Sequence, residues 1–133
     1  MSETFQVDQT LLKRFGEIRV EIPLRQALVD DEHGISVTHD EPRPMTFTIH
    51  PYDVWATFDL DGRPVNVRVT GPYTRTDETT GERFHPEESG ASRTVTYSVA
   101  PQQGKAFKRI EEMPAWLTDL LAQYGPSITW RSA

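Results

Sequence analysis

The sequence predicts an α+β fold, in which a curved, mainly antiparallel β-sheet of about five or six strands packs against a C-terminal α-helix. Apolar and polar residues alternate in several short stretches, which is the pattern of strands with one buried face. The connections between these stretches are short or medium and contain no helix long enough to join parallel neighbours, which favours antiparallel pairing. Near the carboxyl end the apolar residues instead repeat with helical spacing.

The first fifty residues contain one helix signal and three strand signals. Asp8 is placed to cap a short helix, which Gly16 would end. Alternation over residues 18–24 predicts a strand, and Pro23, which cannot donate a ladder hydrogen bond, indicates that this strand either lies at a sheet edge or stops pairing there. Two further short strands are expected at 35–37 and 45–49.

The clearest signal is a β-hairpin over residues 54–70. Apolar residues alternate with polar ones on both sides of Asp61-Gly62. Asp-Gly predicts a two-residue type I′ turn, because both central residues of that turn need positive φ. In the resulting register the facing pairs are Phe58 and Val65, Ala56 and Val67, Trp55 and Arg68, and Val54 and Val69. The apolar pairs form one continuous face for packing.

Downstream of the hairpin the chain is polar over residues 76–92, and we expect a flexible loop there. Residues 95–99 alternate as the last clear strand, and residues 105–112 fit either a strand end or an irregular segment. Pro114 suits the first position of a helix that Gly125-Pro126 would end. The leucines of this helix are expected to cover the apolar side of the hairpin.

Composition indicates a single domain spanning residues 1–133. The chain has no cysteine, which excludes thiol nucleophiles and Cys-ligated metals. No apolar run approaches the roughly 20 residues of a membrane span, and the first residues lack the pattern of a signal peptide. We therefore expect a cytoplasmic protein with no membrane partner. The net charge of −6 arises in the first half of the chain and argues against nucleic-acid binding.

Trp55, Asn66 and Arg68 lie on the polar side of the predicted hairpin and are candidate binding residues. An indole beside a guanidinium is a frequent recognition element, because the cation is attracted to the face of the ring. Two structural alternatives remain for this group. The residues would then form an ordinary pair on a solvated face, or the tryptophan would be buried under a second layer.

Arg83, Phe84 and His85 form a second candidate group, within the 76–92 loop. A guanidinium, an aromatic ring and an imidazole on one mobile element suit a binding loop. The alternative is a disordered insertion that binds nothing.

The sequence predicts no catalytic residue, metal site or cofactor. The segment Asp59-Leu60-Asp61-Gly62 lacks the remaining ligands of a calcium loop. An alternative, a small hydrolase or metal-dependent enzyme, would need a concave site that unites at least two of His33, His39, His50, Asp53 and Asp59. A further alternative, a small-ligand-binding β-barrel, would need an apolar cavity inside the curved sheet.

Three segments near the carboxyl end carry a family resemblance: Gly104-Lys105-Ala106-Phe107-Lys108, Met113-Pro114-Ala115-Trp116-Leu117 and Tyr124-Gly125-Pro126. Together with an Arg-rich, Lys-poor composition, this last quarter of the chain resembles small uncharacterised proteins of actinobacteria and their phages. The resemblance implies provenance and brings no catalytic residue or activity.

These patterns predict a non-enzymatic binding or accessory protein, with phage encoding as one origin, that acts on a host protein or on a second copy of itself. A dimer is expected, because an antiparallel sheet leaves two edges open to pairing. The contact segments would be the strand over 18–24 and the tail at Ile128 and Trp130.

Overall fold

The structure is a computed structural model that describes residues 7, 10–14, 16–30, 32–40, 42–84 and 91–124. In chain order its strands are β1 (Thr10–Arg14), β2 (Glu17–Pro23), β3 (Ile35–His39), β4 (Met45–Ile49), β5 (Asp53–Phe58), β6 (Pro64–Asp77), β7 (Arg83–Phe84), β8 (Ser92–Ser98) and β9 (Phe107–Arg109). A 3-10 helix (Ile110–Glu112) and α1 (Ala115–Ala122) follow. The α+β prediction is confirmed, with more strands than the five or six expected.

The strands form one sheet in the order β1-β2-β5-β6-β4-β3, with β7 and β8 also paired to β6 and with β9 paired to β8. Every pairing is antiparallel except the one between β8 and β9, which is parallel. The mainly antiparallel prediction is therefore confirmed. The ordered path ends at β1 on one side and at β3 on the other, so the described strands form an open sheet.

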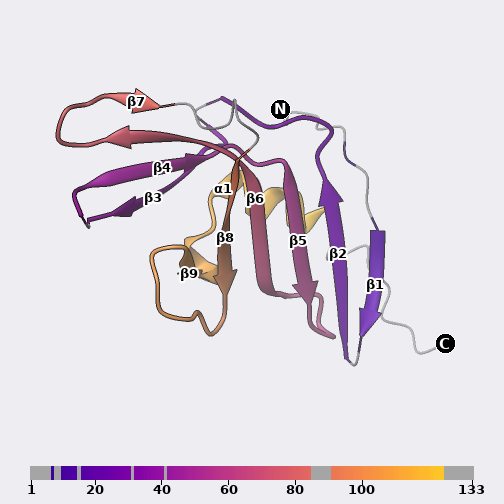
Figure 1. The fold of residues 1–133 in the computed structure, drawn as a ribbon. Coiled ribbons are helices and arrows are strands. Elements are labelled where there is room, and N and C mark those ends of the chain that lie inside the picture. Colours follow the sequence, from indigo (N-terminus) through magenta and orange to yellow (C-terminus); the bar gives the residue numbers. More distant parts are fainter. Residues whose placement is uncertain are drawn as a thin grey trace.

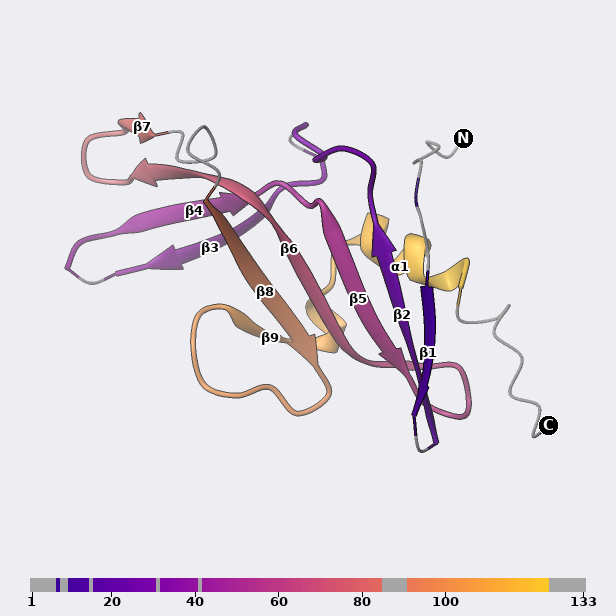
Figure 2. The same cartoon turned by 45° about the vertical axis from the view of Figure 1, so that its right-hand side comes forward.

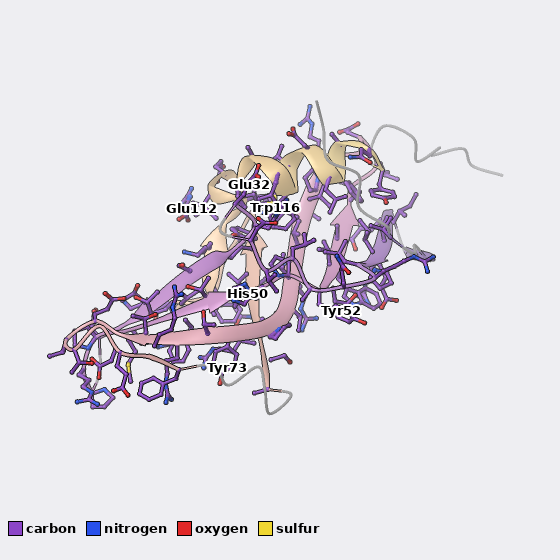
Figure 3. All side chains as sticks on the ribbon, turned by 90° about the horizontal axis from the view of Figure 1, so that it is seen from above. Glu32, His50, Tyr52, Tyr73, Glu112 and Trp116 are labelled. Atoms are coloured by element: carbon purple, nitrogen blue, oxygen red, sulfur yellow. The ribbon has the colours of Figure 1, made fainter. Side chains whose placement is uncertain are left out.

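Strand β6 divides the sheet into a body and an arm. Its first half pairs with β5 and β8, which together with β1, β2 and β9 make up the body. Its second half pairs with β4 and β7, which together with β3 make up the arm. Figure 1 shows the arm extending to one side of the body, and Figure 3 shows β6 turning a corner between them.

Gly71 lies at this corner, where β6 passes under the connection between β4 and β5. The backbone N–H of His50 donates to the carbonyl of Pro72 at 2.7 Å, and that of Tyr52 donates to the carbonyl of Thr70 at 2.9 Å. These bonds hold the connection against Gly71 from both sides. A side chain at residue 71 would meet this backbone directly.

Helix α1 covers the apolar face of the body, as Figures 1 and 2 show. Leu117, Leu120 and Leu121 are almost fully buried, and they belong to the same apolar cluster as the inward residues of β2, β5, β6 and β8. Inward residues recur at every second position of these strands because side chains alternate between the two faces of a sheet. The prediction that the helix covers the hairpin is confirmed. Pro114 is the N-cap of the helix and not its first residue.

The hairpin turn differs from the predicted type I′ turn. The N–H of Asp59 donates to the carbonyl of Arg63 at 2.9 Å, and the N–H of Gly62 donates to the carbonyl of Asp59 at 3.0 Å, which closes a three-residue loop. Gly62 has a φ of 79°, and in the described chain only glycines have positive φ. The Asp59 carboxylate favours this wider loop by accepting bonds from the N–H groups of Asp61 and Arg63.

The wider loop changes only the end of the predicted register. Phe58 pairs with Pro64 and not with Val65, and the register shifts between Thr57 and Phe58. Val65 is the extra residue that restores the predicted alignment, as in a β-bulge. The pairs Ala56 with Val67, Trp55 with Arg68, and Val54 with Val69 are confirmed.

For the amino-terminal segment the predicted helix is wrong, and of the two alternatives for Pro23 the structure has the end of the strand and not a sheet edge. Residues 10–14 form β1 and not part of a helix that begins after Asp8, because pairing with β2 supplies hydrogen bonds that an isolated helix of two turns cannot match. As a result β2 lies between β1 and β5 and is not an edge strand. Pro23 is tolerated because it is the last residue of β2. Hence the predicted contact strand over 18–24 is not open to a partner strand, and Ile128 and Trp130 lie outside the described residues.

The predicted 76–92 loop is partly regular structure. Strand β6 continues to Asp77, a buried residue whose carboxylate accepts the N–H of Thr79 at 2.9 Å and pairs with Arg43 at 3.0 Å. This turn leads into β7, so the structured part of the loop belongs to the arm. The ambiguous segment 105–112 contains β9 and the 3-10 helix.

Candidate functional site

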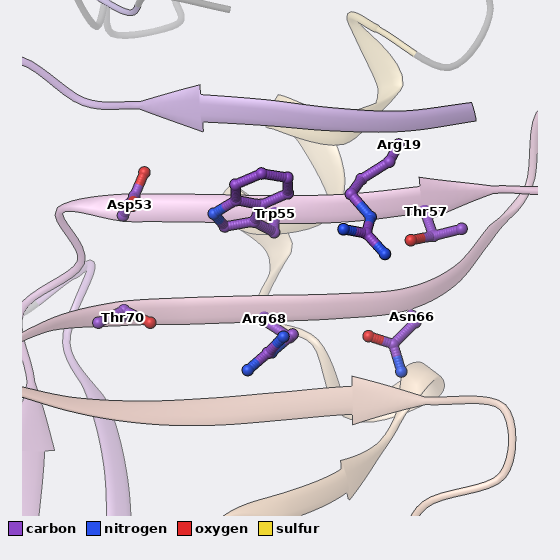
Figure 4. A pocket seen from close by; sticks show the side chains of 7 residues that line it. All are labelled: Arg19, Asp53, Trp55, Thr57, Asn66, Arg68 and Thr70. Atoms are coloured by element: carbon purple, nitrogen blue, oxygen red, sulfur yellow. The ribbon is translucent and has the colours of Figure 1, made fainter. Parts of the chain in front are cut away.

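The face of the sheet opposite α1 carries two adjoining cavities. The first has a volume of about 360 Å³ and is lined by Arg19, Asp53, Trp55, Thr57, Asn66, Arg68 and Thr70 (Figure 4). The second has a volume of about 440 Å³ and is lined by Asn66, Arg68, Thr94, Thr96, Gln102, Ala106 and Phe107. Because Asn66 and Arg68 line both, we treat the two as one feature and call it the polar groove.

Strand alternation places these side chains together. On β5 the residues Val54, Ala56 and Phe58 are buried toward α1, so the residues between them point into the groove. The register then brings polar residues of neighbouring strands opposite one another. Across the body the facing pairs are Arg19 with Thr57, Thr57 with Asn66, Trp55 with Arg68, Asp53 with Thr70, Thr70 with Thr94, and Arg68 with Thr96.

The cation nearest the Trp55 ring is Arg19, with its Cζ 5.5 Å from the ring centroid. In Figure 4 the Arg19 guanidinium reaches from β2 across β5 toward β6. Arg68 lies opposite Trp55 as predicted, but the predicted cation-π contact is made by Arg19. Within the described chain, neither arginine forms an ion pair. The groove therefore presents two guanidinium groups beside one indole.

Asp53 is the acidic residue of the groove. Its Oδ1 is buried and has no hydrogen-bond partner among the described residues. The hydroxyl of Thr70, the residue opposite, is hydrogen bonded to the Thr94 hydroxyl at 2.7 Å. Burial raises the pKa of the Asp53 carboxyl above its ordinary value. A carboxylate oxygen without a donor is unfavourable in the folded chain, which is a common property of binding sites.

Replacing Asp53 with asparagine is expected to increase stability at pH 7. The raised pKa means that the folded state favours the protonated carboxyl. The protonated Asp53 carboxyl therefore contributes stability that is fully present below its unfolded pKa of about 3.8. This stability is lost as the pH rises through the pKa of Asp53 in the folded state. The advantage of Asp53→Asn should be largest near pH 7 and should shrink toward pH 3.8. Urea unfolding of both proteins between pH 3 and pH 7 measures this difference, and an advantage that does not change with pH would contradict the assignment.

The second predicted group lies elsewhere in the molecule. Arg83 and Phe84 form β7 in the arm, where they pair with Thr76 and Arg75. The guanidinium of Arg75 lies over the Phe84 ring, at 4.7 Å from its centroid. These contacts give Phe84 a packing role in the arm. His85 lies outside the described residues, and the structure does not bring Arg83 or Phe84 to the polar groove.

The histidines and acidic residues that an enzyme would need are not gathered in the groove. Of the five candidates, only Asp53 lines it. His33 is buried, with Nδ1 2.7 Å from Asp30 Oδ1 and its ring 5.1 Å from that of Trp116. His39 instead packs against Phe47, at 5.2 Å between ring centroids. Asp59 shapes the hairpin turn.

Asp30, Glu32 and His33 form the one group in the described chain with metal-ligand spacing, their ligand atoms lying within 4.8 Å of one another. Both carboxylates are exposed, whereas His33 is buried. Burial pushes the pKa of Asp30 upward, but the hydrogen bonds from His33 and its charge together bring it below the ordinary value. Asp30 thus acts as the partner that holds the buried His33 against Trp116.

Trp55, Asn66 and Arg68 were predicted from the sequence, whereas Arg19, the place of Asp53 in the groove and the contributions of β8 and β9 were not. Arg19 occupies a polar position in a predicted strand. Its proximity to Trp55 follows only when β2 is known to pair with β5.

Comparison of the chain with protein-family models, with curated proteins and with solved structures finds no match. None of the helices in the described residues has the length and apolar character that crossing a bilayer requires.

Proposed function

We propose that this chain is a non-enzymatic binding protein whose polar groove holds an extended segment of a protein partner. The observation that carries the proposal is the joining of two cavities, of about 360 and 440 Å³, through Asn66 and Arg68 on the sheet face that α1 leaves open. The residues that line them come from β2, β5, β6, β8 and β9 and from the connection before β9.

The length of the groove favours a peptide over a small molecule. Neighbouring strands lie about 4.8 Å apart, so five adjacent strands span roughly 19 Å. An extended chain advances about 3.3 Å per residue, and about six residues would fill that length. The groove runs across the strands, and β5, β6 and β8 already have partners on both sides. The partner segment would therefore be recognised by side chains and not by adding a strand to an edge.

The side chains of the groove suit such recognition. Tryptophan and arginine are the residue types that most often dominate binding energy at protein interfaces. Trp55 and Phe107 provide rings toward the two ends, and the hydroxyl and amide groups between them can donate and accept hydrogen bonds. A hydrolytic reaction would need a second acid or base in the groove beside Asp53, and Glu21, which pairs with Trp55 from β2, lines neither cavity. The residues of the described chain that line the groove offer arginine, amide, hydroxyl and aromatic groups instead.

The proposal is tested by selecting peptides with the purified chain from a random hexapeptide library displayed on phage. The variant Trp55→Ala should bind the selected peptides at least about tenfold more weakly than wild type, because the aromatic anchor at one end of the groove is removed. Leu60→Ala is the matched control, since Leu60 is 60% exposed on the hairpin turn and does not line the groove. Recovery of no binding peptide, or equal affinity for wild type and Trp55→Ala, would reject the groove as a peptide site.

A further inference from the structure

We infer, on the basis of the proposed function, that the partner segment is bipolar: it places one carboxylate between Arg19 and Arg68 and one hydrogen-bond donor against Asp53. The inference rests on two observations in the same cavity. The two guanidinium groups have no ion-pair partner within the described chain, and a buried carboxylate oxygen has no donor.

The positions of the two arginines define the acidic end of the ligand. Arg19 lies on β2 opposite Thr57, and Arg68 lies on β6 opposite Trp55, so their backbones are two strands and two residues apart, roughly 12 Å. Figure 4 shows the Arg19 guanidinium directed toward β6 and the Arg68 guanidinium between β6 and β8. An arginine side chain is long enough for Arg68 to turn toward a group held beside Arg19. A guanidinium fork matches the two oxygens of a carboxylate. One acidic side chain held between the two guanidinium groups, beside the Trp55 ring, would meet both cations.

Asp53 defines the donor end. It lies two residues before Trp55 on β5, a separation of about 7 Å along the strand, and it faces the same cavity. Its orphan Oδ1 needs an N–H or O–H that the described chain does not supply. Neighbouring side chains of an extended peptide point to opposite sides. In a peptide with a donor residue and an acidic residue next to each other, one side chain would therefore point toward Asp53 and the other toward the two arginines.

The surrounding charges favour a single carboxylate over a polyanion. Glu21 pairs with Trp55 from β2, so a second acidic residue stands on the same face as Asp53. A run of acidic residues or a phosphate backbone would place several negative charges near these two carboxylates, which is unfavourable. A partner with one acidic side chain avoids that repulsion. A phosphate group is the competing source of negative charge, and competition by inorganic phosphate distinguishes it from a carboxylate.

The experiment uses the full chain and four labelled hexapeptides with the sequence Gly-Ser-x-y-Ser-Gly. The central pair xy is Lys-Glu, Lys-Gln, Leu-Glu or Leu-Gln, and affinities are measured by fluorescence anisotropy at low salt. We expect the Lys-Glu peptide to bind about tenfold more tightly than either singly substituted peptide, since each charge-assisted hydrogen bond contributes about that much. Inorganic phosphate at millimolar concentration should not displace it.

Two variants test which groove residue binds the acidic side chain of the peptide and which binds the donor. Arg68→Gln should remove the preference for Glu over Gln, and Asp53→Asn should reduce the preference for Lys over Leu. Arg63→Gln is the matched control, because Arg63 lies at the hairpin turn outside the groove, and it should leave both preferences intact. Equal affinities for the four peptides, preferences unchanged in Arg68→Gln, or displacement by phosphate would overturn the bipolar assignment. If the bipolar assignment fails in this way but the peptides selected from the library still need Trp55 for binding, the groove remains a peptide site. Failure of the bipolar assignment is therefore distinguishable from failure of the proposed function.

Discussion

The variant Gly71→Ala is expected to lose about 3 kcal/mol or more of folding free energy, a large part of the roughly 5–15 kcal/mol by which a domain is stable. An alanine Cβ at this position would overlap the backbone carbonyl oxygen of His50, lie 2.8 Å from the carbonyl carbon of that residue and lie 3.1 Å from the backbone nitrogen of Tyr52. All three atoms belong to the backbone, so no side-chain rotation can relieve the overlap. Urea unfolding followed by tryptophan fluorescence measures the loss.

Gly81→Ala is the control for this variant. Gly81 has a φ of +77°, and a Cβ there would meet no atom of the described residues within 4 Å. The only expected penalty is that of a left-handed backbone, about 1 kcal/mol. If Gly71→Ala were no less stable than Gly81→Ala, the close approach of the β4–β5 connection to β6 would be wrong.

Leu117→Ala is expected to lower the free energy of unfolding by about 3 kcal/mol. Leu117 is 0% exposed and lies in the apolar cluster that α1 shares with the body of the sheet. Truncating the side chain removes its burial and leaves a cavity that a packed sheet cannot fill completely. The loss would be measured as a lower urea midpoint with an unchanged m-value.

Asp119→Ala provides the comparison for Leu117→Ala from the exposed side of the same helix. A surface substitution of this kind is expected to change stability by no more than about 0.5 kcal/mol. Similar losses for the two variants would mean that α1 does not cover the sheet, and the assignment of the groove to the open face would then lose its basis.

Local patterns were sufficient to predict most of the elements. The alternation around Trp55 predicted the hairpin and three of its facing pairs, because side-chain period and turn length act over a few residues. The helical spacing of Leu117, Leu120 and Leu121 predicted the helix and its buried side. These features depend on interactions between residues that are near in sequence or share one obvious apolar face.

The remaining features depend on partners that are distant in the chain. Residues 10–14 carry a weak helix signal, which pairing with β2 overrides. The ambiguous segment that contains β9 becomes a strand only through its parallel partner β8. Arg19 joins Trp55 because β2 neighbours β5, a fact of strand order that alternation cannot supply. The site was therefore predicted only in the part that a single hairpin builds.

Strand β6 also links the two halves of the molecule mechanically. It runs through both without interruption for 14 residues, and its corner at Gly71 is clamped by hydrogen bonds on either side. Because hydrogen bonds hold the corner on both sides, we expect the body and the arm to rotate together and not about a hinge at Gly71. The arm extends for roughly 20 Å beyond that point, so a rotation of about 10° in the body would swing its tip by roughly 3 Å. A bound peptide that alters the twist of the strands under the groove would thus be expected to shift the position of Asp77, the last residue of β6.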